Sequence, residues 1–390
     1  MVRVAVVHDY FTQHGGAENV AGELYNLVPH ADMFATVALD KYVPASIPRE
    51  KLQTSWMQNL PHIAELYRLY FPLYPLGVQS LDLSRYDLVI SSSSGYGKGV
   101  RTRSDALHVC YCHTPMRWIW RYHDYVSREK LAVSKRLLLP VALKGLKAWD
   151  IDAARQPDQY VANSRVVAQR IRDCYGREAI VIPPPIDAGR FVLQAQQDDY
   201  YLVLARFVSY KRIDLAVSAC NTLGRRLFVL GGGPESDKLR ALAGPTVTVL
   251  GHVSDDEATR YASECRALLF PGEEDFGMAP LELAAAGRPT IAYRAGGALE
   301  TIVEGTTGIF FDQQDVSSLA EAILRFETMS WDPNTLRAHA LRFDVSQFRR
   351  KFYTLLDSLG FPIGAEVADS SRRTAPFRPV RPEDSHAVNR

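Results

Sequence analysis

Residues 267–287, "ALLFPGEEDFGMAPLELAAAG", decide the fold class. The stretch begins with a short apolar run of the kind that forms a strand buried on both faces of a parallel sheet. A loop containing Phe276 and Gly277 follows, and a helix rich in alanine and leucine starts near Ala279. The stretch therefore predicts a strand, a loop and a helix in the order that α/β folds repeat.

The same order recurs in two series along the chain, separated by "IPPPIDAGRFVLQAQQDD". Three prolines and a polar run disfavour a helix there and indicate a connection between domains. We predict an α/β protein with two doubly wound Rossmann-like domains, at 1–185 and 186–342. A C-terminal helix at 343–360 could pack against either domain, and the tail at 361–390 has little to bury and is expected to be flexible.

Within the first series, the apolar pattern predicts a strand at 33–39 and helices at 61–80 and 128–152. Residues 128–147 carry six lysines and arginines against one acid, interleaved with leucines. This segment could lie on an anionic membrane and meet a lipid-linked acceptor there, or it could be a solvated helix face over a core stripe. Pro140 is expected to interrupt its amphipathic pattern.

Composition narrows the class of protein. The 390 residues are 47% hydrophobic and 23% charged with a net charge of +1, which is typical of a globular protein and excludes a nucleic-acid-coating or disordered chain. The N-terminus lacks the pattern of a signal peptide, and no apolar run reaches the roughly 18 residues that span a bilayer. The five cysteines are scattered, so we expect reduced thiols in a cytoplasmic protein, with at most peripheral contact at the inner face of the plasma membrane.

Gly15 and Gly16 follow the first predicted strand and directly precede a helix. Backbone N–H groups at such a place can approach an anion near the positive end of the helix, although a plain tight turn would look the same. Asp40 could imitate the ribose-binding acid of a nicotinamide site, but the adjacent glycines do not have the required spacing. The sequence therefore gives no support for a nicotinamide cofactor.

Charged and glycine-rich loops also follow the strands of the second series. Arg206 and Lys211 leave a strand end and can converge on a diphosphate, although two exposed cations can also form a solvated face. Gly231–Gly233 end another strand, where the backbone approaches a ligand or simply turns into a helix. Cationic side chains can neutralise the phosphate charge, and no D-x-D pair that could bind a metal ion ends a strand. We therefore expect no metal.

Two carboxylates flank the loop of the opening stretch. Glu282 in the first helical turn could merely complement the helix dipole, but Glu274 in the loop has no such role. Backbone N–H groups around Gly277–Ala279 could face a phosphate, while one carboxylate accepts hydroxyls from a sugar and the other from a ribose. The pattern suits a nucleotide sugar.

Five motifs in this order, HGGAEN, ARFVSYKRID, GGGP, LGHVSDDE and EEDFGMAPLE, resemble the GT-B glycosyltransferases of family 4, which are retaining sugar-nucleotide transferases. The resemblance covers residues 1–360 and implies two domains that face a central cleft. "YDLVISSSSGYGKGV" and "HVCYCHTPMRWIWRYHDY" are similar to a bacterial branch that adds mannose to lipid-linked O-antigen and other polysaccharide precursors. The resemblance thus implies GDP-mannose as donor and a lipid-linked or oligosaccharide acceptor, with UDP-sugars left open.

The family resemblance also implies roles for residues. Glu274 would hold the hydroxyls of the donor sugar and Glu282 the ribose, while His113 would lie beside the reacting carbon or a sugar oxygen, unless it only caps the following Thr-Pro turn. The residues expected to be catalytic are His113, Arg206, Lys211 and Glu274. The expected donor-binding residues are Gly15, Gly16, Arg206, Lys211, Gly232, His252, Val253, Glu274, Phe276, Gly277, Met278, Ala279 and Glu282.

Two rival functions fit the same fold. A sugar-nucleotide epimerase would need acid and base residues for its chemistry, and beyond His113 the sequence offers no second well-placed candidate. A non-catalytic nucleotide-sugar-binding subunit is expected to lack one of the two carboxylates or the Arg206 and Lys211 pair, all of which are present.

Overall fold

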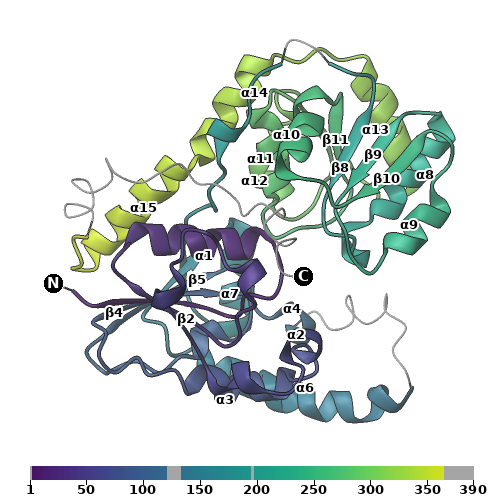
Figure 1. The fold of residues 1–390 in the computed structure, drawn as a ribbon. Helices are drawn as coiled ribbons and strands as arrows, with labels where there is room; N and C mark the ends of the chain where they lie inside the picture. The colour runs from purple at the N-terminus through teal and green to yellow at the C-terminus, as the bar shows by residue number, and fades with distance from the viewer. Residues whose placement is uncertain (1, 121–132, 195–196, 364–390) are drawn as a thin grey trace, which may run out of the picture. The chain divides into compact units, whose positions relative to one another are not determined.

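The computed structural model describes residues 2–120, 133–194 and 197–363, and the chain divides into two compact units (Figure 1). Unit 1 comprises the chain up to Pro184 and again from Phe348, and unit 2 comprises Pro185–Gln347. Most of the tail predicted at 361–390 lies outside the described residues.

Unit 1 is built on a parallel sheet of seven strands in the order β3-β2-β1-β4-β5-β6-β7. The strands are β1 Val4–His8, β2 Asp32–Ala35, β3 Leu52–Thr54, β4 Leu88–Ser93, β5 Leu107–Cys112, β6 Gln159–Ala162 and β7 Ala179–Val181. The helices are α1 Gly16–Leu27, α2 Ile63–Leu66, α3 Tyr74–Gln79, α4 Arg117–Trp120, α6 Val133–Ala153 and α7 Arg165–Tyr175. Since successive side chains alternate between faces, Val4 and Val6 pack toward α1, and Ala5 and Val7 pack into the core that α3 and α6 cover.

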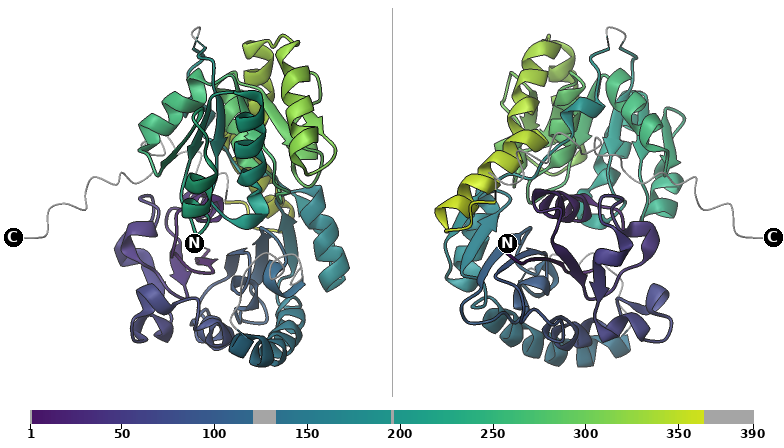
Figure 2. Two further views of the ribbon diagram at one scale, coloured as in Figure 1. Left: turned by 90° about the vertical axis from the view of Figure 1, so that its right-hand side faces the viewer. Right: turned by 60° about the vertical axis from the view of Figure 1, so that its left-hand side comes forward.

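Unit 2 has a parallel sheet of six strands in the order β10-β9-β8-β11-β12-β13, with helices on both faces (Figures 1 and 2). The strands are β8 Tyr201–Leu204, β9 Leu227–Leu230, β10 Val247–Gly251, β11 Ala267–Phe270, β12 Thr290–Tyr293 and β13 Gly308–Phe311. The helices are α8 Ile213–Leu223, α9 Ser236–Leu242, α10 Asp255–Glu264, α11 Met278–Ala285, α12 Ala298–Thr301, α13 Val316–Glu327 and α14 Pro333–Ala340. Leu202 packs toward α11 and α14, and its neighbour Val203 packs toward α8 and α13.

The C-terminal helix α15, Val345–Ser358, returns the chain to unit 1 and lies along α1 (Figures 1 and 2). Its apolar stripe joins the same core as β1, through Phe348, Phe352, Leu355 and Leu356. Tyr353 donates a hydrogen bond of 3.0 Å to the carbonyl of Leu27, and Arg349 pairs with Glu23 at 2.8 Å. The sequence pattern left the partner of this helix open, and the structure assigns it to unit 1.

Two elements differ from the sequence prediction. The helix expected at 61–80 is broken into α2, the 3-10 turn η4 (Phe71–Leu73) and α3, because Pro72 and Pro75 cannot continue a hydrogen-bonded helix. The strand expected at 33–39 ends at Ala35, after which Thr36 bonds to the loop that follows β1.

The helix expected at 128–152 corresponds to α6, which continues through Pro140. The backbone is therefore helical through the proline, as the predicted helix requires, and the interruption of the amphipathic pattern stays a prediction. Residues 128–132 lie outside the described residues. No helix in the described part of the chain combines the length and apolar character needed to cross a membrane.

Candidate functional site

The strand order of unit 2 reverses between β8 and β11. In open parallel sheets, ligands bind outside the carboxyl ends of the strands at such a reversal, where the two flanking loops diverge. Arg206 and Lys211 lie in the loop after β8, and Glu274 lies in the loop after β11. The fold thus brings predicted residues from two distant segments to one edge of one sheet.

Lys211 and Glu274 form an ion pair at this edge, in which the ammonium group bonds to Oε1 of the carboxylate. The two side chains retain only 15% and 18% of their surface exposed, so water screens the pair less than a surface pair. Arg206 is exposed on the same loop as Lys211. A cation for phosphate oxygens and a carboxylate for hydroxyl groups therefore lie side by side.

Glycines hold the loop after β11 in place. A Cβ atom on Gly272 would lie 2.7 Å from Cα of Lys211, and one on Gly297 would lie 2.2 Å from Cα of Phe276. The N–H of Gly297 also donates a hydrogen bond of 2.8 Å to the carbonyl of Glu274. Because no side chain fits at these two approaches, the backbone that carries Glu274 is fixed against its neighbours.

Gln314 ties the two loops together, a role that the sequence motifs did not reveal. Its side-chain amide donates to the carbonyl of Pro271 at 2.9 Å, and its Oε1 accepts from Arg212 at 3.3 Å. Arg212 has φ of 50°, the left-handed conformation that non-glycine residues adopt rarely and that is often found at functional sites. Sequence separation hides this bridge, because Gln314 follows a different strand, β13.

The glycine stretch after β9 packs against the neighbouring loops. Gly231 has φ of 130°, and a Cβ atom on it would lie 1.9 Å from the carbonyl oxygen of Ala205. A Cβ atom on Gly232 would lie 2.3 Å from Nε2 of His252, the exposed residue that follows β10. The structure therefore brings Gly232 and His252 together, with Val253 partly buried beside them.

Helix α11 begins beside the acidic loop. Gly277 adopts φ of 90° at its N-cap, and Phe276 is buried below it. No hydrogen bond within the described residues takes up the backbone N–H groups of Gly277, Met278 and Ala279. These donors at the positive end of a helix are suited to a phosphate oxygen.

Glu282 lies one turn into α11, and its carboxylate accepts no hydrogen bond from another described residue. Burial raises the pKa of its carboxyl group, the cation Arg190 opposes the rise, and Asp255 adds to it. Arg190 itself bonds to the carbonyl of Asp255 and to Thr259 on α10, each at 2.8 Å. A desolvated carboxylate without a protein donor is suited to accept ligand hydroxyls.

The other predicted residues belong to unit 1. Gly15 is the N-cap of α1 without a side-chain hydrogen bond, and Gly16 is its first residue. His113 follows β5; its Nε2 lies 2.8 Å from the hydroxyl of Ser92, and its carbonyl accepts from Asn163 at 2.9 Å. Ser92 also contacts His8, whose pKa is lowered by burial against the opposing effect of Asp9.

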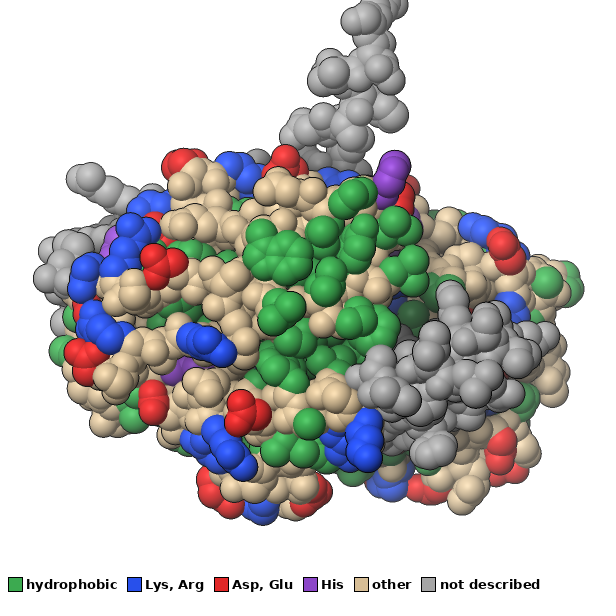
Figure 3. Space-filling model, turned by 90° about the horizontal axis from the view of Figure 1, so that it is seen from below, with side chains coloured by type: hydrophobic (Ala, Val, Ile, Leu, Met, Phe, Trp, Pro, Cys, Tyr) green, Lys and Arg blue, Asp and Glu red, His purple; other side chains and the backbone are tan. Residues whose placement is uncertain are grey.

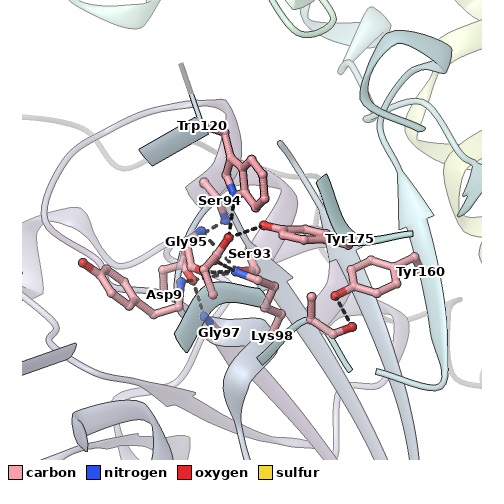
Figure 4. Close-up of polar contacts among 12 residues, drawn as sticks. Asp9, Ser93, Ser94, Gly95, Gly97, Lys98, Trp120, Tyr160 and Tyr175 are labelled. Atoms are coloured by element: carbon pink, nitrogen blue, oxygen red, sulfur yellow. Dashed lines mark hydrogen bonds and ion pairs between the residues drawn. The ribbon is translucent and has the colours of Figure 1, made fainter. Parts of the chain in front are cut away.

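The strand-order reversal of unit 1, between β1 and β4, is occupied by a side chain of the protein (Figure 4). Asp9 follows β1, and its carboxylate accepts hydrogen bonds from the backbone of the loop after β4: from Ser94 at 2.7 Å, Tyr96 at 2.9 Å and Gly97 at 2.5 Å. Backbone donors that could face a phosphate are thus already satisfied. This distinguishes the two reversals, because the backbone donors at the start of α11 in unit 2 have no such partner among the residues that the structure describes.

A buried ion pair supports this loop of unit 1 (Figure 4). Lys98 donates to the carbonyl of Gly95 and lies 2.5 Å from Asp150 in α6. Asp150 also accepts from Trp120 at 2.7 Å and Tyr175 at 2.9 Å. The charges are therefore paired and hydrogen-bonded as burial requires, and the cluster joins α4, α6 and α7.

Two family models match the chain in succession. Residues 14–190 match the model described as Glycosyltransferase Family 4, and residues 186–341 match the model described as Glycosyl transferases group 1. The chain belongs to the GT-B glycosyltransferases of family 4. The fold class expected from the sequence, with two Rossmann-like domains, is confirmed.

Relatives in this family include mannosyltransferases. The chain is 28% identical over 218 residues to the GDP-mannose-dependent alpha-(1-6)-phosphatidylinositol monomannoside mannosyltransferase of Mycolicibacterium smegmatis, a match that covers 48% of this chain and 56% of that one. It is 24% identical over 236 residues to the O-antigen chain mannosyltransferase C of Escherichia coli, covering 56% of this chain and 61% of that one. The match therefore spans less than two thirds of the length of these relatives.

Among solved structures, Anabaena HepE in complex with UDP and glucose is similar with a TM-score of 0.66 and 16% identity, over 92% of this chain and 100% of that one. At this identity the likeness concerns the GT-B fold alone. In the described residues, no group of three or more histidine, cysteine, aspartate or glutamate side chains is placed to hold a metal ion.

Proposed function

We propose that the chain is a retaining glycosyltransferase that binds a nucleoside-diphosphate sugar at the strand-order reversal of unit 2. The observation that carries this proposal is the partly buried pair of Lys211 and Glu274 between β8 and β11. The same loops also carry backbone N–H groups that no described residue takes up, so the reversal offers a cation, a carboxylate and backbone donors, the groups that a diphosphate and a sugar require. At the corresponding reversal of unit 1, the loop donors are bonded to Asp9.

In this proposal, Lys211, Arg206 and the start of α11 bind the diphosphate, Glu274 accepts the sugar hydroxyls and Glu282 accepts the ribose hydroxyls. Gly232, His252 and Val253 contact the nucleotide through their backbone. His113, Gly15 and Gly16 contribute from unit 1 at the reacting sugar and the diphosphate, as the family resemblance implies.

The reaction breaks the bond between the anomeric carbon and the diphosphate oxygen, and it forms a bond from that carbon to the acceptor oxygen on the same face. The acceptor hydroxyl proton passes to the departing phosphate. Negative charge therefore develops on the diphosphate, where the cations and helix N–H groups stabilise it. A metal ion is not needed in this scheme, because cationic side chains hold the leaving group.

We further propose GDP-mannose as the donor and a lipid-linked or oligosaccharide acceptor in the synthesis of a cell-surface polysaccharide. Support comes from the relatives whose names specify GDP-mannose and an O-antigen chain. UDP-sugars are the competing donors. A sugar-nucleotide epimerase or a non-catalytic binding subunit is less well supported, since the chain belongs to a transferase family and retains both carboxylates.

The test is a turnover assay of the full chain with GDP-mannose and lipid-diphosphate oligosaccharide acceptors. We expect release of GDP and an α-linked mannoside, and Lys211→Ala should lower the rate by about 100- to 1000-fold because it removes a donor to the developing charge. Lys238→Ala on the exposed face of α9 is the matched control and should remain active. Turnover with UDP-sugars alone would overturn the donor, and epimerised nucleotide sugar without transfer would overturn the function.

The acceptor side of the proposal includes peripheral contact with an anionic membrane. Figure 3 shows a broad apolar area on the face of unit 1 that carries α2, α3 and α6. Large side chains are exposed on adjoining elements of this unit: Trp56 by 42%, Leu69 by 61% and Leu76 by 60%. Lys144 and Lys147 are exposed on α6, within the basic segment 128–147, so apolar and cationic groups occur on the same unit.

Vesicle flotation tests this contact. The chain should float with vesicles containing anionic lipid and less with purely zwitterionic vesicles, and the double variant Leu69→Gln and Leu76→Gln should lose the interaction. Leu324→Gln, at a residue 46% exposed in unit 2, is the control. Failure to float, or equal flotation of the double variant, would contradict the membrane contact without affecting the donor site.

A further inference from the structure

Two histidines and a serine form a continuous chain of contacts at the carboxyl edge of the unit 1 sheet. His8 ends β1, Ser92 lies opposite it in β4, and His113 follows β5. The Ser92 hydroxyl lies 3.1 Å from Nδ1 of His8 and 2.8 Å from Nε2 of His113. The three residues are buried, so the geometry of their hydrogen bonds is set by the protein rather than by competing water.

The carbonyl group of Ser92 determines the direction of these hydrogen bonds. His8 Nδ1 lies 3.2 Å from that oxygen as well as from the hydroxyl. A carbonyl oxygen only accepts, so a lone pair on Nδ1 would face the lone pairs of the carbonyl. His8 therefore carries a proton on Nδ1 and donates toward Ser92.

The hydroxyl of Ser92 has one proton and faces two ring nitrogens. Since Nδ1 of His8 donates and the described residues offer the hydroxyl no other acceptor, the serine proton is directed to Nε2 of His113, which accepts it. A neutral imidazole that accepts at one nitrogen carries its proton on the other. The contacts of Ser92 thus determine the tautomer of His113.

We propose that His8 and Ser92 are positioning residues that fix His113 as the tautomer with its proton on Nδ1. The ring is also held by its backbone, because the N–H of His113 donates to Ser93 at 2.9 Å and its carbonyl accepts from Asn163. The catalytic consequence rests on the proposed function. His113 offers an N–H donor to an oxygen of the donor sugar or phosphate, and it does not act as the base that removes the acceptor proton.

The direct test is a nuclear magnetic resonance spectrum of the full chain with isotope-labelled histidine nitrogens, in which one-proton and lone-pair nitrogens have distinct shifts. The His113 signals are assigned by their loss in His113→Gln. In the native chain at neutral pH, we expect Nδ1 of His113 to bear the proton and Nε2 to be the acceptor. A proton on Nε2 would overturn the proposal.

Ser92→Ala removes the shared hydroxyl and should leave His113 as a mixture of tautomers or with its proton on Nε2. Ser91→Ala is the matched control, because Ser91 precedes it in β4 and its hydroxyl lies 2.8 Å from Nε2 of His108 instead. Burial lowers the pKa of His108 to about 4, so that ring is neutral at the pH of the measurement. The control should change the signals of His108 and leave those of His113 unaltered.

His8→Phe tests whether His8 directs the hydroxyl of Ser92. Without the Nδ1–H donor, the Ser92 hydroxyl is no longer directed, and both tautomers of His113 should appear. An unchanged His113 signal in this variant would show that His8 does not help to set the tautomer of His113.

Kinetics distinguish this proposal from the proposed function. Ser92→Ala should lower kcat by about tenfold, the effect of one lost hydrogen bond, and change KM for the donor by less than about twofold. A native chain without transferase activity would contradict the proposed function, and the histidine spectrum would still decide the tautomer. Unchanged kcat in Ser92→Ala beside a changed tautomer would overturn the catalytic consequence.

Discussion

The carboxyl group of Glu282 affects both the stability of the fold and the proposed binding of the ribose. Its carboxyl group lies in the first turns of α11 and lacks a hydrogen-bond donor from the described residues. Burial raises its pKa, so the folded protein holds that proton more tightly than the unfolded chain does. Its ionisation therefore opposes folding, by an amount that grows as the pH rises from the ordinary pKa of a glutamate to the raised folded value.

Glu282→Gln should therefore increase thermal stability at neutral pH, and the gain should shrink as the pH falls from the raised folded pKa of Glu282 to the ordinary pKa of a glutamate, below which no gain remains. The same variant should raise KM for the nucleotide sugar, because an amide accepts fewer hydrogen bonds from the ribose hydroxyls than a carboxylate does. Thermal unfolding across a pH series and donor kinetics measure the two effects. Glu321→Gln, exposed on α13, is the control, and a loss of stability in Glu282→Gln at neutral pH would contradict the account.

Residue-level prediction from sequence worked best where a side chain follows a strand and has a charge that burial would otherwise disfavour. Lys211 and Glu274 were found in this way, and the structure brings them into contact. Gln314 and Asp9 were missed, because their partners are backbone groups of remote loops and leave no mark in the local pattern. The tautomer of His113 likewise depends on tertiary contacts alone.

The loop after β11 is held by close backbone approaches, which makes it sensitive to very small additions. Gly297 has φ of −68°, a conformation that alanine adopts readily, so a substitution there acts only through space. The added carbon would meet Cα of Phe276 at 2.2 Å and push the loop that carries Glu274.

Gly297→Ala should destabilise the protein by about 1 to 3 kcal/mol, as overpacking does, and weaken nucleotide binding by about 10- to 100-fold. Denaturant unfolding and a nucleotide titration measure these effects. Gly145→Ala in α6 is the control, since the added carbon meets nothing within 4 Å, and it should be neutral or slightly stabilising. Equal nucleotide affinity of Gly297→Ala and the native chain would show that the loop is not fixed as described.

At the scale of elements, the apolar runs predicted the buried strands of both sheets well, whereas prolines explain the errors. Pro72 and Pro75 divide a segment with a helical apolar pattern, while Pro140 is accommodated within α6. The short edge strand β3 and helix α14 were not predicted, because three to eight residues carry too little periodicity.

At the scale of the whole molecule, the chain passes from unit 1 into unit 2 at Pro185 and leaves unit 2 at Gln347. Unit 1 is therefore completed only by the C-terminal helix α15. Phe352 of α15 is fully buried in the core that contains β1 and α1, and its ring lies 6.3 Å from that of Tyr111. The sequence predicted this helix and its apolar stripe but not which unit it covers, because an apolar stripe does not specify the surface on which it packs.

Phe352→Ala should cost about 3 to 5 kcal/mol in unit 1, the usual effect of removing a buried aromatic ring. Hydrogen exchange should show lost protection in β1, β4 and β5, with the strands of unit 2 unaffected. Lys351→Ala at the exposed neighbouring position is the control and should change little. Loss of protection in the strands of unit 2 instead would contradict the assignment of α15.

The central claim is that the strand-order reversal of unit 2 binds a nucleoside diphosphate. The most direct measurement is a calorimetric titration of the full chain with GDP and with UDP, repeated on Lys211→Ala and on the control Lys238→Ala. The account predicts that GDP binds more tightly than UDP and that Lys211→Ala alone weakens binding by about tenfold or more, the value of a charge-assisted hydrogen bond. A preference for UDP would contradict the proposed donor and keep the site, whereas no binding of either nucleotide, or equal affinity of Lys211→Ala, would contradict the site itself.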